Sequence, residues 1–182
     1  GPKRMFVSRF GDQGIILQAD YSQLELRVAA IFSRDSALIK AYNEGKDLHI
    51  YAASKVYGVP EDEVTDDMRT AAKAVNFGLI YGKGAKSLAE DMKVSLEEAE
   101  EFLRKYFEEF KGVKKWLDET KEFVAKNKYV KTLTGRWRRL PGIDSNRKGV
   151  VAEALRQASN APIQGTGSDI TLISLIQINN EL

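Results

Sequence analysis

Signals that start and stop helices recur along this chain, and they constrain its fold more than any other feature. Thr65 is a favourable N-cap residue, and acidic residues follow it directly, where the positive end of a helix dipole favours negative charge. Gly82 would end that helix near residue 81. Two Ser–Glu pairs have the spacing of a capping box: Ser22 with Glu25, and Ser95 with Glu98. We therefore expect a predominantly helical fold.

Two segments predict β-structure. The apolar run at residues 15–17 ends at Asp20 and predicts a short buried strand. Further along, the pattern predicts a strand over residues 129–134 that turns at Gly135, a loop over 136–148, a helix over 149–160, a break at Pro162 and a new helix from about Gly167. The expected fold class is α+β, predominantly α-helical.

Composition excludes several kinds of protein. The 182 residues include no Cys and one His, which excludes disulfide frameworks, thiolate metal sites, cysteine nucleophiles and the two-His zinc motif of metalloproteases. Apolar runs such as residues 28–32 are far too short to cross a bilayer. Residues 1–19 also lack the long apolar core of a signal peptide. We expect a cytoplasmic protein with no membrane partner.

Charge is distributed unevenly, although 28 Lys and Arg nearly balance 26 Asp and Glu. Basic side chains outnumber acidic ones between residues 126 and 156, where only Asp144 and Glu153 are acidic. The basic residues there are Lys126, Lys128, Lys131, Arg136, Arg138, Arg139, Arg147, Lys148 and Arg156. Tyr129 and Trp137 lie among these cations and could stack on nucleic-acid bases. From charge alone, a polyanion-binding surface and an ordinary solvated loop are equally good interpretations.

A row of cationic and aromatic side chains lies on the helix expected over residues 66–81. Its members are four residues apart: Arg69, Lys73, Phe77 and Tyr81. Each step turns about 40° around the helix axis, so the row winds slowly along one side. Two cations followed by two rings suit a triphosphate at one end and a flat base at the other. On spacing alone a structural arrangement is modestly favoured, in which Asp66 pairs with Arg69 and the two rings face a core.

Two carboxylates lie near the expected first strand. Asp20 follows that strand and precedes a helix, a usual place for a metal ligand in a sheet-based site. A lone Asp at such a position more commonly only helps to cap the helix. Glu25 is equally ambiguous, since it could complete the capping box with Ser22 or point into a site.

A third group of polar side chains is again spaced by four residues. Arg156, Asn160 and Gln164 carry guanidinium and amide donors, and Pro162 bends the chain before the last of them. Such donors match the acceptors that every base pair presents in the minor groove, so they could grip a duplex regardless of its sequence. As a bare pattern this group is weak evidence.

Taken together, the three groups resemble a known family. Residues 20–27 (DYSQLELR) and 69–82 (RTAAKAVNFGLIYG) resemble motifs A and B of family A DNA polymerases, the bacterial DNA polymerase I group. Residues 160–166 (NAPIQGT) are similar to a third family segment. Residues 45–49 (GKDLH) and 134–141 (TGRWRRLP) resemble the intervening family sequence. The matches run in order from about residue 6 to the end of the chain.

The resemblance implies a fold and an activity. The fold would be a helical fingers subdomain inserted into part of a palm, whose sheet is antiparallel, in a polymerase shaped like a right hand. Residues 1–38 would be a palm part with motif A, residues 39–150 the fingers with motif B, and residues 151–182 palm helices that contact DNA. The activity would be template-directed DNA synthesis, in the cytoplasm of a bacterium or a phage-infected cell.

The resemblance also implies roles for matching residues. Asp20 would be one of two carboxylates that hold two catalytic Mg²⁺ ions, with the Tyr21 carbonyl as a further ligand. Glu25 would pack beneath the nucleotide sugar and exclude a 2′-hydroxyl. Arg69 and Lys73 would be catalytic through their charges on the triphosphate. Other contacts to the dNTP would come from Tyr21, Gln23, His49, Phe77 and Tyr81. Contacts to primer–template DNA would come from Arg136, Arg156, Asn160 and Gln164.

The chain departs from the family pattern in one respect. The third family motif, a His-Asp-Glu triplet, has no counterpart, because the single His is His49. Asp169 is a poor substitute, since it lies within an expected helix. One Asp cannot hold two divalent cations, so we expect the second carboxylate to come from a complementary polymerase chain or segment. The alternative is a catalytically inactive nucleotide- and nucleic-acid-binding module derived from a polymerase.

Overall fold

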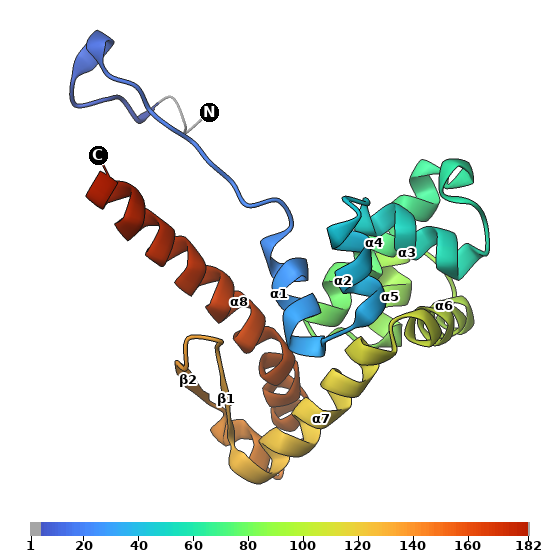
Figure 1. Cartoon of the computed structure of the whole chain (residues 1–182). Helices are drawn as coiled ribbons and strands as arrows, with labels where there is room; N and C mark the ends of the chain where they lie inside the picture. The colour runs from blue at the N-terminus through green and yellow to red at the C-terminus, as the bar shows by residue number, and fades with distance from the viewer. Residues whose placement is uncertain (1–4, 182) are drawn as a thin grey trace.

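Helices dominate the computed structural model, which describes residues 5–181 (Figure 1). The α-helices are α1 (Leu24–Ser33), α2 (Ser36–Asn43), α3 (Leu48–Tyr57), α4 (Asp66–Ile80), α5 (Ala85–Met92), α6 (Leu96–Glu109), α7 (Lys111–Asn127) and α8 (Lys148–Glu181). Short 3₁₀ turns are η2 (Gly11–Gln13), η3 (Glu61–Glu63) and η4 (Pro141–Asp144). Two strands, β1 (Tyr129–Lys131) and β2 (Trp137–Arg139), form an antiparallel ribbon. The expected α+β, predominantly α-helical class is confirmed.

The larger hydrophobic core lies among α1 to α7. Each of these helices buries one apolar face against its neighbours, and the core includes Leu48 of α3, Val75 of α4 and Tyr106 of α6. Phe110, between α6 and α7, is fully buried and packs against Tyr106 with ring centroids 4.5 Å apart. Because α4 buries one side in this core, its other side is left facing outward.

A smaller core joins the β-ribbon to α7 and α8. It consists of Val124, Val130, Leu140 and Ala158, all buried. In Figure 1 the yellow α7 runs from the helical cluster to the ribbon, where it meets the orange start of α8. Helix α8 contributes Ile163 to the larger core as well, so it ties the two cores together.

The predicted helix starts are confirmed at two positions and wrong at one. The Thr65 side chain accepts a hydrogen bond from the Met68 amide and caps α4, and Ser95 with Glu98 forms a capping box at α6. The expected box of Ser22 with Glu25 does not form. Gln23 precedes α1 with φ of 54°, in the left-handed region, and its side chain makes no capping hydrogen bond. Glu25 instead bonds to Tyr81, across the molecule.

The predicted strand at residues 15–17 is wrong. These residues form extended coil, and Ile15 and Leu17 are 89% and 80% exposed. A strand needs a neighbour for its backbone groups, and in residues 5–181 the only ladder joins β1 to β2. The loop expected over residues 136–148 is also wrong in part, because it contains β2 and η4. In the antiparallel pairing of β1 with β2, Val130 lies opposite Arg138.

The predicted break at Pro162 is wrong, since α8 continues through it. Pro162 removes a backbone donor, at a cost of about 3 kcal/mol in a helix interior. Packing offsets that loss: Pro162, Ile163, Thr166 and Gly167 are all buried. Within the described residues, no helix, α8 included, is both long and apolar enough to cross a bilayer.

Gly82 brings the end of α4 against α8, and Gly82→Ala should destabilise the fold more than Gly45→Ala. Both glycines have positive φ, 68° and 69°, so a Cβ costs about 1–2 kcal/mol at either position. At Gly82 the Cβ would also lie 2.8 Å from Arg156 Cα, whereas at Gly45 nothing lies within 4 Å. We expect Gly82→Ala to lose about 1–3 kcal/mol more, measured by urea denaturation. Equal losses in the two variants would contradict a close α4–α8 approach.

Candidate functional site

Helix α4 carries the predicted row, with Lys73 and Tyr81 exposed and Arg69 and Phe77 half-buried. Arg69 donates to the carboxylate of Asp47, with Nη2 2.8 Å from Oδ2, and Lys73 is exposed. Farther along, the rings of Phe77 and Tyr81 are stacked with centroids 6.5 Å apart. The prediction that Asp66 pairs with Arg69 is therefore wrong. The prediction that both rings face a core holds only for Phe77, which packs against the larger core.

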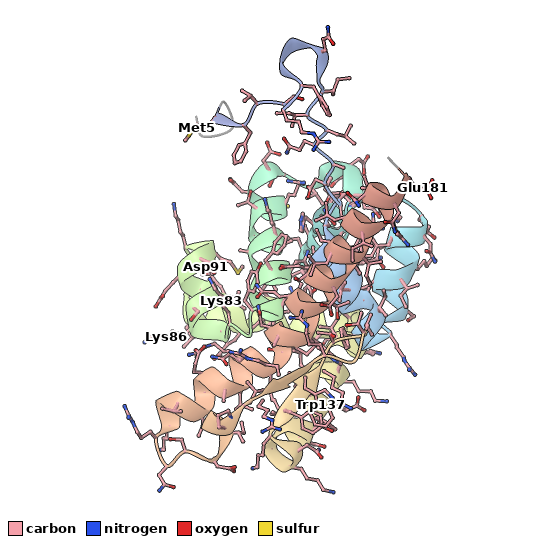
Figure 2. The ribbon with its side chains drawn as sticks, turned by 90° about the vertical axis from the view of Figure 1, so that its left-hand side faces the viewer. Met5, Lys83, Lys86, Asp91, Trp137 and Glu181 are labelled. Carbon is pink, nitrogen blue, oxygen red and sulfur yellow. The ribbon has the colours of Figure 1, made fainter. Side chains whose placement is uncertain are left out.

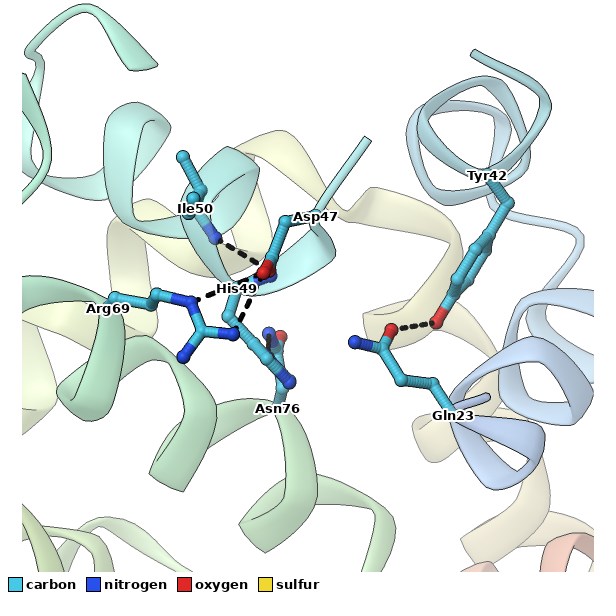
Figure 3. A network of polar contacts seen from close by, with 7 residues as sticks. All are labelled: Gln23, Tyr42, Asp47, His49, Ile50, Arg69 and Asn76. Carbon is cyan, nitrogen blue, oxygen red and sulfur yellow. Dashed lines mark hydrogen bonds and ion pairs between the residues drawn. The ribbon is translucent and has the colours of Figure 1, made fainter. Parts of the chain in front are cut away.

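His49 lies beside the middle of this row. It comes from the first turn of α3, is 3% exposed, and its ring centroid is 5.7 Å from that of Phe77. Its Nδ1 is 3.0 Å from the amide nitrogen of Asn76 (Figure 3). Burial lowers the pKa of His49, and the charges of Arg69 and Lys73 lower it further against the opposing effect of Asp47. The ring is therefore neutral at physiological pH and lies within the field of both cations.

Asp47 links α3 to the row, and sequence reasoning missed it. Its carboxylate caps α3 by accepting from the amides of His49 and Ile50, and it also accepts from Arg69 (Figure 3). Burial by itself would raise the pKa of Asp47, but the hydrogen bonds and the charge of Arg69 outweigh it, so the pKa is lowered. The sequence did indicate its capping role, because an Asp directly before an amphipathic segment is a favoured N-cap residue.

The segment around Asp20 is tied to other helices through the residues that follow it. Asp20 is exposed, and the next residue, Tyr21, has its hydroxyl 2.6 Å from Ser174 Oγ on α8. Gln23 accepts from the Tyr42 hydroxyl at 3.3 Å (Figure 3). Because its neighbours are bonded to α2, α4 and α8, the Asp20 carboxylate is carried on a tethered segment.

Glu25 and Tyr81 close the aromatic end of the row. The Tyr81 hydroxyl donates to Glu25 Oε2 at 2.8 Å, and Gln164 of α8 also interacts with this hydroxyl. The hydrogen bond to Glu25 raises the pKa of Tyr81, and burial raises it further. A residue from motif A, one from motif B and one from the third family segment thus meet at one point.

The predicted DNA-contacting residues divide between two grooves. Asn160, Gln164 and Arg136 line one groove, together with Trp137 of the β-ribbon. Arg156 is in a second groove beside Gly82, where it pairs with Glu153. The structure therefore brings together three of the four residues and places Arg156 in the neighbouring groove.

The first groove has a basic and aromatic wall. Trp137 is 56% exposed and stacks on Tyr129, with ring centroids 4.0 Å apart. Lys131 Nζ lies 4.2 Å from the Trp137 ring centroid. Figure 2 shows Trp137 well separated from the ion pair between Lys83, in the α4–α5 connection, and Asp91 of α5. Of the interleaved cations and rings predicted from the sequence, Tyr129, Lys131 and Trp137 thus pack together on the ribbon.

Asp169 is engaged in holding the ribbon to α8. Its carboxylate forms an ion pair with Arg136 at 2.8 Å and accepts from the Thr134 hydroxyl. The pKa of Asp169 is lowered, first by the Thr134 hydrogen bond. Within the described residues no three carboxylate or imidazole groups gather as a metal cluster. The exposed carboxylate of Asp20 suits Mg²⁺ in its chemistry, but this chain's described residues do not complete a site for it.

Comparison with known proteins gives consistent matches. The model for DNA polymerase family A matches residues 2–182. A DNA polymerase of Bacillus phage SP01 is 49% identical over 185 residues, covering 99% of this chain and 20% of that protein. DNA polymerase I of Mycobacterium bovis is 44% identical over 167 residues, covering 92% of this chain and 18% of that protein. The chain therefore spans about a fifth of the length of these relatives.

A solved structure has the same fold. It is the POL domain of Pol1 from M. smegmatis, in complex with DNA primer–template and dNTP. The TM-score is 0.85 and the sequence identity 43%, over 89% of this chain and 29% of that one.

Asp47→Ala should destabilise the chain by about 1–2 kcal/mol at pH 7, because it removes a helix cap and a partly exposed ion pair. The pKa of Asp47 is lowered from 3.8 by folding, so its contribution is present above pH 3.8 and is lost as the pH falls through the lower folded value. Urea denaturation at pH 7 and at pH 3 or below checks this. Asp66→Ala is the control, with little expected loss; an equal loss at both pH values for Asp47→Ala would contradict the assignment.

Proposed function

Because the chain belongs to DNA polymerase family A, we propose that it supplies the fingers and two flanking palm parts of an enzyme that extends a DNA primer on a template. The palm parts are residues 1–38 and 151–182, and the fingers are residues 39–150. The observation that carries the proposal is the row on α4, with cations at one end, rings at the other, and Glu25 and Gln164 meeting its last ring.

In this function Arg69, Lys73 and His49 bind the triphosphate of the incoming dNTP. Lys73 is exposed and free to take a phosphate oxygen, while Arg69 is held in place by Asp47 until a phosphate competes for it. Their positive side chains stabilise the negative charge that builds on the leaving pyrophosphate. His49 adds a neutral donor from the adjoining helix.

Phe77 and Tyr81 form the surface for the base. Their stacked rings give a flat apolar face next to the cations, so one side of a nucleotide could lie along the row. The hydrogen bond from Tyr81 fixes the Glu25 carboxylate at this end. A fixed carboxylate beneath the sugar leaves no room for a 2′-hydroxyl, which selects deoxyribonucleotides.

Asp20 and the Tyr21 carbonyl would hold Mg²⁺. Bound there, the ions would supply the Lewis acidity that nucleotidyl transfer needs. Asp20 offers one carboxylate, so the second comes from a complementary segment or chain. Uncovered apolar side chains support such a segment: Ile15, Ile16 and Leu17 are exposed, as are Leu172, Ile173, Leu175, Ile176 and Ile178 of α8. Figure 1 shows the N-terminal segment from residue 5 and the C-terminal end of α8 projecting toward the same side of the molecule.

The groove lined by Asn160, Gln164 and Arg136 would hold primer–template DNA, with Arg156 on its flank. Its amide donors could contact minor-groove acceptors present in every base pair, and the basic ribbon could contact phosphates. The M. smegmatis relative is described in complex with primer–template and dNTP, which supports both partners.

Primer extension tests the function directly. The chain alone should not extend a primer, whereas a mixture with a chain that carries the family's missing carboxylate motif should. In the mixture Asp20→Ala should abolish extension, and Asp62→Ala on the exposed turn η3 should not. Lys73→Ala should raise the KM for dNTP about tenfold, with Lys86→Ala on α5 as its control. Extension by the chain alone would refute the need for a second carboxylate, and a mixture that binds dNTP and DNA without extension would support the inactive module.

Glu25→Ala should relax selection against ribonucleotides by about tenfold or more in the active mixture, because the sugar gains space. Tyr81→Phe, which frees Glu25 but leaves its carboxylate, should relax selection less. The measurement is the ratio of kcat/KM for a dNTP and the matching NTP, with Glu44→Ala as the control. Unchanged selectivity in Glu25→Ala would show that Glu25 serves only to hold α1 against α4.

A further inference from the structure

Three buried polar side chains beneath the row on α4 are linked by hydrogen bonds. The Tyr106 hydroxyl donates to Asn76 Oδ1 at 2.8 Å, and Asn76 Nδ2 is 3.0 Å from His49 Nδ1. The three residues are 3%, 1% and 3% exposed and come from α6, α4 and α3. None of the roles assigned above uses Asn76 or Tyr106.

The Tyr106 hydroxyl determines which atoms of Asn76 and His49 donate hydrogen bonds and which accept them. The Tyr106 hydroxyl hydrogen has no acceptor among the described residues other than Asn76, and burial raises the pKa of this phenol, which keeps it protonated. A flipped Asn76 amide would leave that hydrogen unpaired in the core, at a cost of about 1–3 kcal/mol. The amide oxygen therefore faces Tyr106 and the amide nitrogen faces His49. Since that nitrogen only donates, His49 Nδ1 must accept, and the ring proton must be on Nε2.

The other ring nitrogen faces outward. His49 Nε2 makes no hydrogen bond within the described residues, yet no buried polar side-chain atom there lacks a partner, so Nε2 reaches solvent. The charged groups that act on the ring are Asp47 of the α3 cap and Arg69 and Lys73 of α4. A proton on Nε2 is thus on the solvent-reaching nitrogen of a ring on which these charges act.

We propose that Asn76 and Tyr106 are positioning residues that hold His49 as a neutral imidazole with its proton on Nε2, ready to donate to a phosphate oxygen. This inference rests on the proposed function for the identity of the ligand, while the tautomer stands without it. A neutral donor adds a hydrogen bond between two cations without adding a third positive charge. Its donor capacity also does not depend on protonation of the ring near neutral pH.

The tautomer can be observed directly because His49 is the single histidine of the chain. The full chain, with ¹⁵N-labelled histidine, gives a long-range ¹H–¹⁵N correlation pattern that distinguishes Nε2–H, Nδ1–H and the imidazolium. We expect the Nε2–H pattern for the wild type at pH 7. Asn76→Asp replaces the donor by an isosteric acceptor, so it should move the proton to Nδ1 or produce the imidazolium. Tyr106→Phe removes the hydroxyl that orients the amide and should give a mixture of the two neutral forms.

Tyr51→Phe is the matched control. It also removes a tyrosine hydroxyl bond between helices, that of α3 Tyr51 to α6 Glu109 at 2.6 Å, without touching Asn76. It should leave the Nε2–H pattern unchanged. An Nδ1–H pattern in the wild type, or an unchanged pattern in Tyr106→Phe and Asn76→Asp alike, would overturn the positioning role.

Addition of dATP with Mg²⁺ then tests the ligand. The Nε2 resonance should shift in the wild type, and affinity should fall about tenfold in Asn76→Asp where its spectrum shows the Nδ1–H form, while Tyr51→Phe binds normally. Binding of dATP with no change at Nε2 would overturn the phosphate contact of His49. No binding of dATP at all, with the Nε2–H pattern intact, would overturn the proposed function and leave the tautomer assignment standing.

Discussion

The burial of one side of α4 is the constraint on which the candidate site depends. Ala72, Val75, Asn76, Leu79 and Ile80 face the core formed with α3 and α6. With 3.6 residues per turn, a helix that buries this side must turn its other side outward. Arg69 and Lys73 are on that side and Tyr81, just beyond the helix, is exposed, while Phe77 packs against the edge of the core. The packing of the core and the layout of the row therefore follow from the same helical periodicity.

Contacts from distant parts of the chain complete the site. Asp47 and His49 reach the cationic end from α3, and Glu25 reaches the aromatic end from α1. The close approach at Gly82 holds α8 near the end of α4, so that Gln164 meets Tyr81. In this arrangement the row is fixed by contacts from α1, α3 and α8 as well as by its own helix.

Local signals in the sequence were sufficient for most helix boundaries, because caps act within a few residues. Thr65 and Ser95 cap their helices as predicted. Predictions that depended on distant partners were wrong: residues 15–17 have no neighbouring strand among the described residues, and α8 continues through Pro162 because the surrounding core holds it.

For the candidate site, too, features that depend on local sequence were predictable and features that depend on distant partners were not. The row on α4 follows from spacing alone, and the family resemblance named His49 and Glu25 beside it. Asp47 and Asn76 were missed because their importance lies in partners from other helices, Arg69 for one and Tyr106 for the other. Spacing of four residues also grouped Arg156 with Asn160, although the structure divides them between two grooves.

Backbone ¹H–¹⁵N correlation spectra recorded during titration with dATP and Mg²⁺ would locate the nucleotide on the chain. The row on α4 predicts that the changing resonances come from the outward side of α4, the first turn of α3 and residues 20–25. Changes confined to α5 and the acidic face of α6, with α4 unaffected, would show that the row has another purpose.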